Sequence, residues 1–296
     1  MQLFLTGHSG FVGKSLVTSY KDTYSIRIWD KKTPVVLTDE DDAVIHLAGK
    51  AHDLKLVAKP DEYYYVNTEL TKQVFNAFLQ SNAQVFITLS SVKAVADSVK
   101  DVLGELYPPD PVTHYGKSKR LAEEYICSKE WSTDKRVYIL RPCMIHGPGN
   151  KGNLNLLYRI VKKGFFWPLG SFDNKRSFLS IDNLLFVIKE LLERTDIPSG
   201  IYHIADDTPL STNELIALMA SCLHKKTRIL YLPKGLLRSL ARMGDFLRLP
   251  LNSERLQKLT DSYVVDNQKL LQALRNPLPI SAKDGLIKTI QSFENS

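Results

Sequence analysis

The stretch QLFLTGHSGFVGKS, residues 2–15, decides the fold, because it joins an apolar strand-like run to a helix-period segment through Gly7, Gly10 and Gly13. Glycine lets the backbone turn tightly and bring its N–H groups close to a phosphate, and it seats the following helix against the strand. The start of a helix also favours an anion. The stretch therefore predicts a strand, a phosphate-binding turn and a helix, in that order.

The spacing of the glycines is G-x-x-G-x-x-G, a variant of the fingerprint of dinucleotide-binding proteins. Asp30 ends the next strand-like run, 23 residues after Gly7, where a carboxylate can bind the hydroxyls of an adenosine ribose. This position favours NAD as the cofactor. Lys31 and Lys32 follow directly and suit a 2′-phosphate, so NADP is the alternative.

Two other interpretations of the loop are weaker. A nucleotide-triphosphate loop, G-x-x-x-x-G-K-[ST], shares the ending Gly13-Lys14-Ser15, but its first glycine would stand where this chain has His8. The run AVIHLAG, residues 43–49, also lacks the terminal aspartate that would hold magnesium. A glycine-rich turn without a ligand is the remaining alternative.

Apolar strand-like runs alternate with helix-period segments along the chain. The runs lie at 2–6, 43–49, 84–91 and 136–142, and the helical segments lie at 11–20, 63–80 and 115–128. This alternation predicts an α/β protein with a Rossmann-type, doubly wound parallel sheet. Only about a dozen residues separate Asp30 from Ala43, too few for a further strand reached through a crossover helix. We therefore expect a trimmed sheet edge after the second strand.

A loop rich in Gly, Pro and Asn, CMIHGPGNKGNLN at 143–155, interrupts the alternation. We expect residues 1–150 to form a dinucleotide-binding domain, completed by a helix and a strand at about 178–206. Residues 151–177 and 207–296 would then form a smaller C-terminal α+β lobe that binds substrate.

Composition excludes several classes of protein. The chain has 296 residues, 44% of them hydrophobic, which excludes disordered and fibrous proteins. Its three cysteines form no C-x-x-C pair and its histidines form no H-x-x-x-H pair, so neither disulfides nor a metal site are predicted. No apolar run reaches the roughly 18 residues of a membrane span, and Met1 leads into the first strand without a secretory signal. We expect a cytoplasmic protein that is not inserted in a membrane.

Lys and Arg exceed Asp and Glu by 39 to 32, which suits phosphate-bearing ligands, nucleic acid or an anionic membrane equally. No array of aromatic and basic residues supports nucleic acid as a partner. The stretch KGLLRSLARMGDFLRL, residues 234–249, is basic and amphipathic, with Leu236, Leu237, Leu240, Met243 and Leu247 on a shared side. We interpret it as a helix packed on the smaller lobe, and contact with an anionic membrane is the alternative.

The stretch THYGKSKR, residues 113–120, places Tyr115 and Lys119 on one face of a predicted helix, at i and i+4. A free phenol has a pKa of about 10, and a nearby ammonium lowers it. The pair is therefore a candidate acid/base device, and an exposed aromatic beside a solvated lysine is the alternative. Ser91 ends the run 84–91, and the carboxyl ends of the strands form the ligand crevice of a doubly wound sheet. We expect Ser91 to lie near the phenol.

Together these motifs resemble the extended short-chain dehydrogenase/reductases that act on nucleotide sugars. The matching motifs are Gly7-x-x-Gly10-Phe11-x-Gly13, HLAG at 46–49, EYYYVNTELT at 62–71, the Ser90-Ser91 pair and Tyr115-x-x-x-Lys119. The run from His46 through AKPDEYYYVN is similar to UDP-galactose 4-epimerases. LSSVKAV, RPCMIHGPGNKGNLN and NKRSFLSIDNL are closer to bacterial reductases of UDP-4-keto-6-deoxy-N-acetylhexosamines. The resemblance covers nearly the whole chain.

The resemblance implies roles for individual residues. Tyr115 would exchange a proton with the C4 oxygen of the sugar, Lys119 would lower the pKa of that phenol and hold the nicotinamide ribose, and Ser91 would hydrogen-bond the same oxygen. Arg176 would bind the diphosphate of the substrate, and Asn153 is a weaker substrate candidate. The residues implied to hold the cofactor or to brace its site are Gly7, Gly10, Phe11, Val12, Gly13, Asp30, Leu47, Ala48, Gly49, Asn67, Tyr115, Lys119 and Pro142.

The reaction implied is the reduction of a 4-keto nucleotide sugar for surface polysaccharide synthesis, and 4-epimerisation with retained NAD is the alternative. A nucleotide diphosphate sugar would be the partner, and a homodimer is expected of the family. A 4,6-dehydratase needs an Asp-Glu pair after the catalytic hydroxyl, and Val92-Lys93 stand there instead. Lys93-Ala94 also replace part of a V-Y-G segment of many epimerases. Outside enzymes, the alternative is a redox sensor that binds a dinucleotide without turnover.

Overall fold

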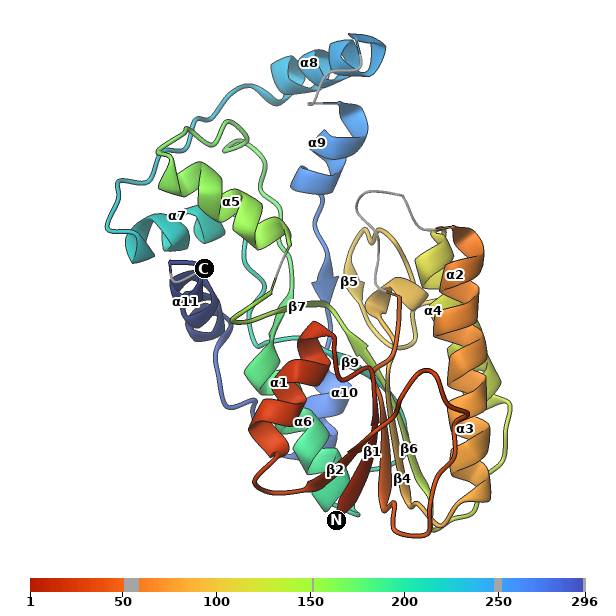
Figure 1. The fold of residues 1–296 in the computed structure, drawn as a ribbon. Coiled ribbons are helices and arrows are strands. Elements are labelled where there is room, and N and C mark those ends of the chain that lie inside the picture. Colours follow the sequence, from red (N-terminus) through yellow and green to blue (C-terminus); the bar gives the residue numbers. More distant parts are fainter. Residues whose placement is uncertain (51–58, 151, 248–251, 295–296) are drawn as a thin grey trace.

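The computed structural model describes residues 1–50, 59–150, 152–247 and 252–294 (Figure 1). At its centre is a sheet of six parallel strands in the order β2-β1-β3-β4-β6-β9. The chain places β2 on one side of β1 and all later strands on the other side, so the sheet is doubly wound, as predicted. The strands are β1 (Gln2–Thr6), β2 (Ser25–Ile28), β3 (Ala43–His46), β4 (Val85–Leu89), β6 (Arg136–Pro142) and β9 (Gly200–Ile204).

Successive side chains of the inner strands point to opposite faces of the sheet, and both faces are buried. In β1, Leu3 and Leu5 belong to the hydrophobic cluster on one face and Phe4 belongs to the cluster on the other. In β4, Ile87 belongs to the same cluster as Leu3 and Leu5, and Phe86 belongs to the cluster of Phe4 on the other face. Burial on both faces explains why these runs are almost wholly apolar.

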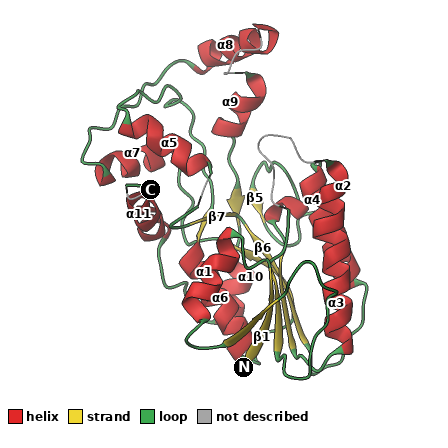
Figure 2. Ribbon diagram, in the orientation of Figure 1, coloured by secondary structure: helices red, strands yellow, loops and turns green. Residues whose placement is uncertain are grey.

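Helices cover both faces of the sheet, as Figures 1 and 2 show. α1, α6 and α10 lie on one face, and α3 and α4 lie on the other. The helices predicted at 11–20, 63–80, 115–128 and within 178–206 are confirmed, whereas α10 was not predicted. Their bounds are α1 (Phe11–Tyr20), α2 (Pro60–Tyr64), α3 (Leu70–Gln80), α4 (His114–Cys127), α6 (Ile181–Glu193) and α10 (Gln268–Leu274).

The sheet ends at β2, which confirms the predicted trimmed edge. Between Ile28 and Ala43 the described chain forms turns and loop without a strand. Asp41 holds this segment, because its carboxylate accepts hydrogen bonds from Thr38 N at 2.7 Å and from Arg27 Nε at 2.9 Å. The order of the strands changes direction at β1, because β2 lies on one side of it and β3 on the other. In doubly wound sheets, ligands bind at the carboxyl ends of the strands at such a switch point.

A third hydrophobic cluster lies away from the sheet, among a second group of helices (Figure 1). These helices are α5 (Asn153–Lys162), α7 (Thr212–Cys222), α8 (Lys234–Leu247), α9 (Ser253–Thr260) and α11 (Ala282–Ser292). Two short parallel pairs lie outside the main sheet, β5 (Val102–Leu103) with β10 (Val264–Val265) and β7 (Met144–His146) with β8 (Phe178–Ser180). The boundaries of the two predicted domains stay a prediction. Within the described residues, no helix has the length and apolar character that crossing a membrane requires.

A buried ion pair joins α4 to the sheet. Arg141 of β6 donates to both carboxylate oxygens of Glu123 in α4, at 2.8 and 2.6 Å, and each residue is 2% exposed. The hydroxyl of Ser90, directly after β4, donates to the same carboxylate at 2.5 Å. Arg141 also lies 3.4 Å from the ring of His203 in β9. This network ties α4 to the carboxyl ends of β4, β6 and β9.

Replacing Arg141 by methionine is expected to lower the free energy of unfolding by about 3–5 kcal/mol, because the Glu123 carboxylate stays buried without its charge partner. Urea denaturation followed by tryptophan fluorescence measures this loss. The double variant Glu123→Leu/Arg141→Met is expected to be more stable than Arg141→Met, since it removes both buried charges.

Lys72→Met is a matched surface control, because it breaks the exposed ion pair between Lys72 and Glu69. Its effect is expected to stay below about 1 kcal/mol. A double variant less stable than Arg141→Met alone would show that the ion pair does not act as described.

Candidate active site

The turn between β1 and α1 packs so tightly that two of its glycines leave no room for a side chain. Gly7 has a φ of +77°, and a Cβ there would lie 2.4 Å from Ala48 N. A Cβ on Gly13 would lie 2.2 Å from the carbonyl oxygen of Gly7. A Cβ on Gly10 would meet only that oxygen, at 3.4 Å. Packing within the chain thus explains the glycines at 7 and 13, whereas Gly10 leaves open space at the start of α1.

The start of α1 is suited to an anion. Its N-cap residue, Gly10, offers no side-chain cap, and its first turn contains no acidic residue. The N–H groups of a first helical turn have no partner within the helix and carry partial positive charge. Phe11 and Val12 form this turn and pack against the sheet. The open backbone and the uncapped helix end fit the pyrophosphate of a dinucleotide.

Three further residues predicted to hold the cofactor lie at the ends of neighbouring strands. Asp30 is exposed just beyond β2, and its carboxylate accepts a hydrogen bond from Lys32 N at 3.0 Å. Leu47 and Ala48 follow β3, and Ala48 N donates to the hydroxyl of Thr6 at 3.2 Å. The structure therefore gathers these residues and the glycine turn at the carboxyl ends of β1, β2 and β3.

A chain of buried hydrogen bonds runs from this loop to the helix that precedes β4. The ring of His46 lies 2.7 Å from the Thr6 hydroxyl and 2.9 Å from the Thr71 hydroxyl, which itself donates to the carbonyl oxygen of Asn67 at 2.8 Å. His46 Nε2 must then donate to Thr71, and Nδ1 must accept from Thr6. Burial lowers the pKa of His46 to about 3, with a smaller contribution from the charge of Lys119. His46 is therefore a neutral link between β1, β3 and α3.

Asn67 lies in a π-helical turn, Tyr65–Glu69, that connects α2 to α3. Its Oδ1 accepts from Lys50 N at 2.8 Å, and its Nδ2 donates to Lys50 O at 3.1 Å and to Ser118 Oγ at 3.0 Å. Single π turns inside α-helices often occur at functional sites. One amide side chain thus joins the segment after β3 to α4, which is the contact expected of a residue that braces this helix.

The start of α4 is built from the motif that carries Tyr115. Thr113 is the N-cap, and its hydroxyl accepts from Gly116 N at 3.1 Å. The Asp97 carboxylate accepts from Thr113 N at 2.9 Å and so fixes the cap. A Cβ on Gly116 would lie 2.4 Å from the carbonyl oxygen of Lys93. Glycine at this position lets α4 approach the 3₁₀ turn Val92–Ala94, which begins directly after Ser91.

Ser91 and Tyr115 meet at this contact, as the sequence predicts. Burial raises the pKa of Tyr115, a hydrogen bond with Ser91 lowers it, and the nearby phenol of Tyr63 raises it. The rings of Tyr63 and Tyr115 lie edge to face, with centroids 6.4 Å apart. Burial is the dominant influence, so the phenol stays protonated at neutral pH. The lowering of its pKa by Lys119 stays a prediction.

Lys119 lies one turn further along α4 and is buried, with 8% of its surface exposed. Its Nζ donates to the carbonyl oxygen of Leu89, the last residue of β4, at 2.7 Å. Burial lowers the pKa of Lys119 to about 8, opposed by the charge of Glu123. A Cβ on Gly49 would lie 3.1 Å from this Nζ, so the loop after β3 borders the amine. Lys119 thus lies where the loop after β3, the end of β4 and α4 come together.

Sequence reasoning missed Glu123 and Tyr63. Glu123 follows Lys119 at the same four-residue interval that separates Lys119 from Tyr115, so the three share one helix face. That repeated spacing was the available signal. For Tyr63 no signal was available, because its contact with Tyr115 depends on how the helix α2 packs against α4.

Two other residues predicted to bind substrate, Arg176 and Asn153, lie between β7 and β8 in the chain. Arg176 Nε donates to the carbonyl oxygen of Asp261 at 3.0 Å, and burial lowers the pKa of its guanidinium. Its backbone bridges to Tyr263, whose hydroxyl donates to Ala96 O at 2.7 Å, just beyond the turn after Ser91. Asn153 begins α5, and its side chain lies outside the described part of the chain.

Pro142, the last predicted cofactor residue, ends β6 and is paired with Ile204 of β9. It lies at the same carboxyl edge of the sheet as Leu89.

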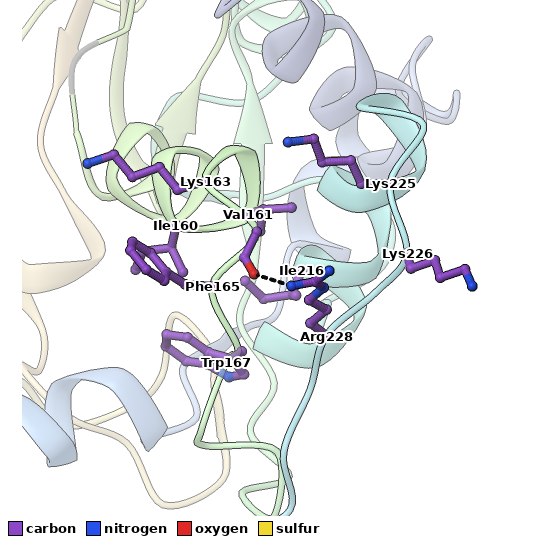
Figure 3. Close-up of a pocket in the computed structure, with 10 residues that line it drawn as sticks. Ile160, Val161, Lys163, Phe165, Trp167, Ile216, Lys225, Lys226 and Arg228 are labelled. Atoms are coloured by element: carbon purple, nitrogen blue, oxygen red, sulfur yellow. Dashed lines mark hydrogen bonds between the residues drawn. The ribbon is translucent and has the colours of Figure 1, made fainter.

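A cavity of about 400 Å³ lies elsewhere, in the second group of helices (Figure 3). It is lined by Ile160, Val161, Lys163, Gly164, Phe165, Trp167, Ile216, Lys225, Lys226 and Arg228. None of the predicted site residues lines it. The hollow is therefore separate from the candidate site around Ser91 and Tyr115. Among the described residues, no group of His, Cys, Asp and Glu is placed to hold a metal ion.

The chain is similar to a known protein family and to several known enzymes. Residues 3–205 match the model of the NAD dependent epimerase/dehydratase family. The chain is 28% identical to the UDP-glucose 4-epimerase of Vibrio cholerae, over 98% of this chain and 95% of that protein. It is 31% identical to the N-acetyl-alpha-D-glucosaminyl-diphospho-ditrans,octacis-undecaprenol 4-epimerase of Escherichia coli O157:H7, over 78% and 75%. It is 27% identical to the GDP-6-deoxy-D-mannose reductase of Pseudomonas aeruginosa, over 84% and 89%.

Among solved structures, the UDP-glucuronic acid 4-epimerase from Bacillus cereus in complex with NAD superposes with a TM-score of 0.76. The identity is 18%, and the match covers 100% of this chain and 99% of that one. At this identity the likeness establishes the fold.

Gly116→Ala is expected to lower the free energy of unfolding by about 1–3 kcal/mol, because the added Cβ would push α4 away from the backbone of Lys93. Chemical denaturation measures the change. Gly235→Ala in α8 is the matched control, since a Cβ there has no neighbour within 4 Å and alanine favours a helix. Equal stability of the two variants would contradict the close contact.

Proposed function

The chain belongs to the NAD dependent epimerase/dehydratase family, and from this premise we propose that it transfers hydride at C4 of a nucleotide sugar. The reaction we favour is the NAD(P)H-dependent reduction of a UDP-4-keto-6-deoxy-hexosamine. The observation that carries the proposal is the hydrogen bond between Ser91 and Tyr115, together with Lys119 one turn further along α4, where it is bonded to the last residue of β4.

The protonation state of Tyr115 supports reduction. Reduction of a ketone places a hydride on carbon and a proton on oxygen, so the catalytic phenol must begin as an acid. Burial raises the pKa of Tyr115, which keeps the phenol in the acid form at neutral pH. An epimerisation needs both forms in turn, the phenolate for its oxidation and the phenol for the reduction that follows, so this pKa fits the reduction step of either reaction.

Proton transfer to the sugar would depend on four residues of the chain, each with its own role. Tyr115 donates its proton to the C4 oxygen, and Ser91, already hydrogen-bonded to that phenol, orients the same oxygen. Lys119 is cationic below a pH of about 8 and stabilises the phenolate that remains. Asn67 donates a hydrogen bond to Ser118 and so braces the turn of α4 that lies between these two side chains.

A nicotinamide dinucleotide would supply the hydride. Its pyrophosphate would lie on the uncapped start of α1 beside Gly10, and its adenosine ribose would lie beside Asp30. The exposed carboxylate of Asp30 favours NADH, and Lys31 and Lys32 keep NADPH as the alternative. Arg176 would bind the substrate's diphosphate from the opposite side.

A UDP-sugar 4-epimerase with retained NAD is the second candidate. Two of the relatives described above carry the name of a 4-epimerase. An epimerase uses the same Ser91, Tyr115 and Lys119 but returns the hydride to the opposite face of the sugar. A redox sensor without turnover has no need of a buried lysine next to a hydrogen-bonded phenol.

The expected homodimer also stays a proposal. Tyr65, in the π turn before α3, and Leu121, in α4, expose apolar side chains, and Leu121 and Tyr125 help to line a shallow hollow on α4. Such a helical surface suits a second copy of the chain.

To separate reductase from epimerase, the purified protein is denatured and the supernatant is assayed for NAD. We expect no stoichiometric NAD. Oxidation of NADH and NADPH is then followed with UDP-4-keto-6-deoxy-GlcNAc, and we expect coenzyme to be consumed once per sugar. Tyr115→Phe is expected to reduce the rate by at least about 100-fold, because it removes the proton donor and leaves the ring in place.

Interconversion of UDP-GlcNAc and UDP-GalNAc without added coenzyme, together with released NAD, would overturn the reductase and establish the epimerase. Unchanged behaviour of Tyr115→Phe in every assay would favour the sensor instead.

A further inference from the structure

Tyr263 lies where the chain passes from the second group of helices to the sheet. It follows α9 and directly precedes β10, and α10 then lies on the sheet (Figure 1). Its backbone pairs with the segment that carries Arg176, because Tyr263 N donates to Lys175 O at 2.7 Å and Ser177 N donates to Tyr263 O at 2.9 Å. On its other side, Arg176 exchanges two backbone hydrogen bonds of 2.9 Å with Leu210. The backbone of Arg176 is therefore held from both sides, and Tyr263 forms one of them.

The side chain of Tyr263 contacts residues 91–97, which we call the Ser91 turn. Its hydroxyl donates to Ala96 O at 2.7 Å and lies 3.3 Å from Val92 O. These two carbonyl oxygens belong to opposite ends of the turn, since Ala96 N itself donates to Val92 O at 3.3 Å. A hydroxyl has one hydrogen to donate, and this one is used within the protein. Tyr263 is therefore placed to hold the turn rather than to give a proton to a substrate.

The ring of Tyr263 is held by the same turn. Lys93 Nζ lies 4.2 Å from the centroid of the ring and donates to Asp97 O at 2.6 Å. An ammonium over the face of an aromatic ring is attracted to it. Lys93 N also donates to the hydroxyl of Ser91, at 3.2 Å. One aromatic side chain thus contacts the turn through its hydroxyl and through its ring.

We propose that Tyr263 is a positioning residue that couples the segment of Arg176 to the Ser91 turn. This inference rests on the proposed function, in which Arg176 binds the diphosphate of the substrate and Ser91 orients the C4 oxygen. The coupling would set the distance between the two ends of the bound nucleotide sugar. A displacement of about 1 Å can lower a rate by about 100-fold, so such a distance must be fixed. The backbone of Tyr263 serves the binding side and its hydroxyl serves the catalytic side, so a substitution can separate them.

Tyr263→Phe removes the hydroxyl and leaves the ring and the backbone pairs in place. We expect kcat to fall by about tenfold or more and KM to stay within about twofold, in the reductase assay or, if the protein is an epimerase, in the epimerase assay. In a Ser91→Ala background, the same substitution is expected to lower kcat by less than about threefold, because it acts through Ser91. A residue that only stabilises the fold would have equal effects in both backgrounds.

Tyr202→Phe is the matched control, because Tyr202 makes the same kinds of contact in β9, outside the Ser91 turn. Its hydroxyl donates to Pro198 O at 2.7 Å, and Lys269 Nζ lies 4.9 Å from its ring centroid and donates to Ile201 O at 2.6 Å. The loss of its hydroxyl is expected to lower the midpoint of urea denaturation about as much as Tyr263→Phe does. Its kcat and KM are expected to stay within about twofold of those of the unaltered chain.

Hydrogen exchange, measured by mass spectrometry on the full-length protein without ligands, provides a readout that needs no activity. We expect the backbone amides of residues 91–97 to exchange faster in Tyr263→Phe and at an unchanged rate in Tyr202→Phe. Unchanged exchange in Tyr263→Phe overturns the inference, and so does a higher KM with unchanged kcat or an equal loss of kcat with and without Ser91. If the unaltered protein has neither activity, the proposed function fails, and the exchange rates still show whether Tyr263 holds the turn.

Discussion

The buried pairing of Glu123 with Arg141 is the constraint on which the rest of the site depends. Two charges taken out of water must keep each other and their hydrogen-bond partners, because either one alone would be costly to bury. Ser90 and His203 complete the shell of the pair at the ends of β4 and β9. Since Glu123 lies two turns after Tyr115 on α4, the pair fixes both the rotation of this helix and its position along the sheet. Tyr115 and Lys119, which share the helix face of Glu123, are therefore held at the carboxyl end of β4.

Close backbone contacts fix the positions of the loops around the site, as the ion pair fixes the position of α4. Because glycine has no Cβ, the loop after β3 can contact Gly7, the turn before α1 can contact Gly13, and the turn after Ser91 can contact Gly116. Polar side chains then lock these contacts, because Thr6, His46, Thr71 and Asn67 exchange hydrogen bonds from β1 to α4. The site is assembled from rigid pieces, as proton transfer over a short distance requires.

The sequence predicted the strands and the trimmed edge because both follow from local rules. Runs buried on two faces must be apolar, and the dozen residues before Ala43 are too few for a further strand together with its crossover helix. The meeting of Ser91 with Tyr115 was also predictable, from the carboxyl end of a strand and an i, i+4 pair. The ion pair of Glu123 with Arg141, the π turn at Asn67 and the bond from Lys119 to Leu89 were not. Each depends on how segments far apart in the sequence settle against one another. The predicted packing of α8 on its neighbours is seen at Leu237 and Ala241, which belong to the hydrophobic cluster of the second group of helices.

Transfer of labelled hydride tests the central claim most directly. A UDP-4-keto-6-deoxy-N-acetylhexosamine is reduced with coenzyme that carries deuterium at C4 of the nicotinamide, and the sugar product is analysed by mass spectrometry and NMR. The account predicts one deuterium, attached to C4 of the sugar, from only one of the two stereoisomers of the labelled coenzyme. A product that lacks deuterium, or that carries it at another carbon, would contradict hydride transfer from the coenzyme to sugar C4.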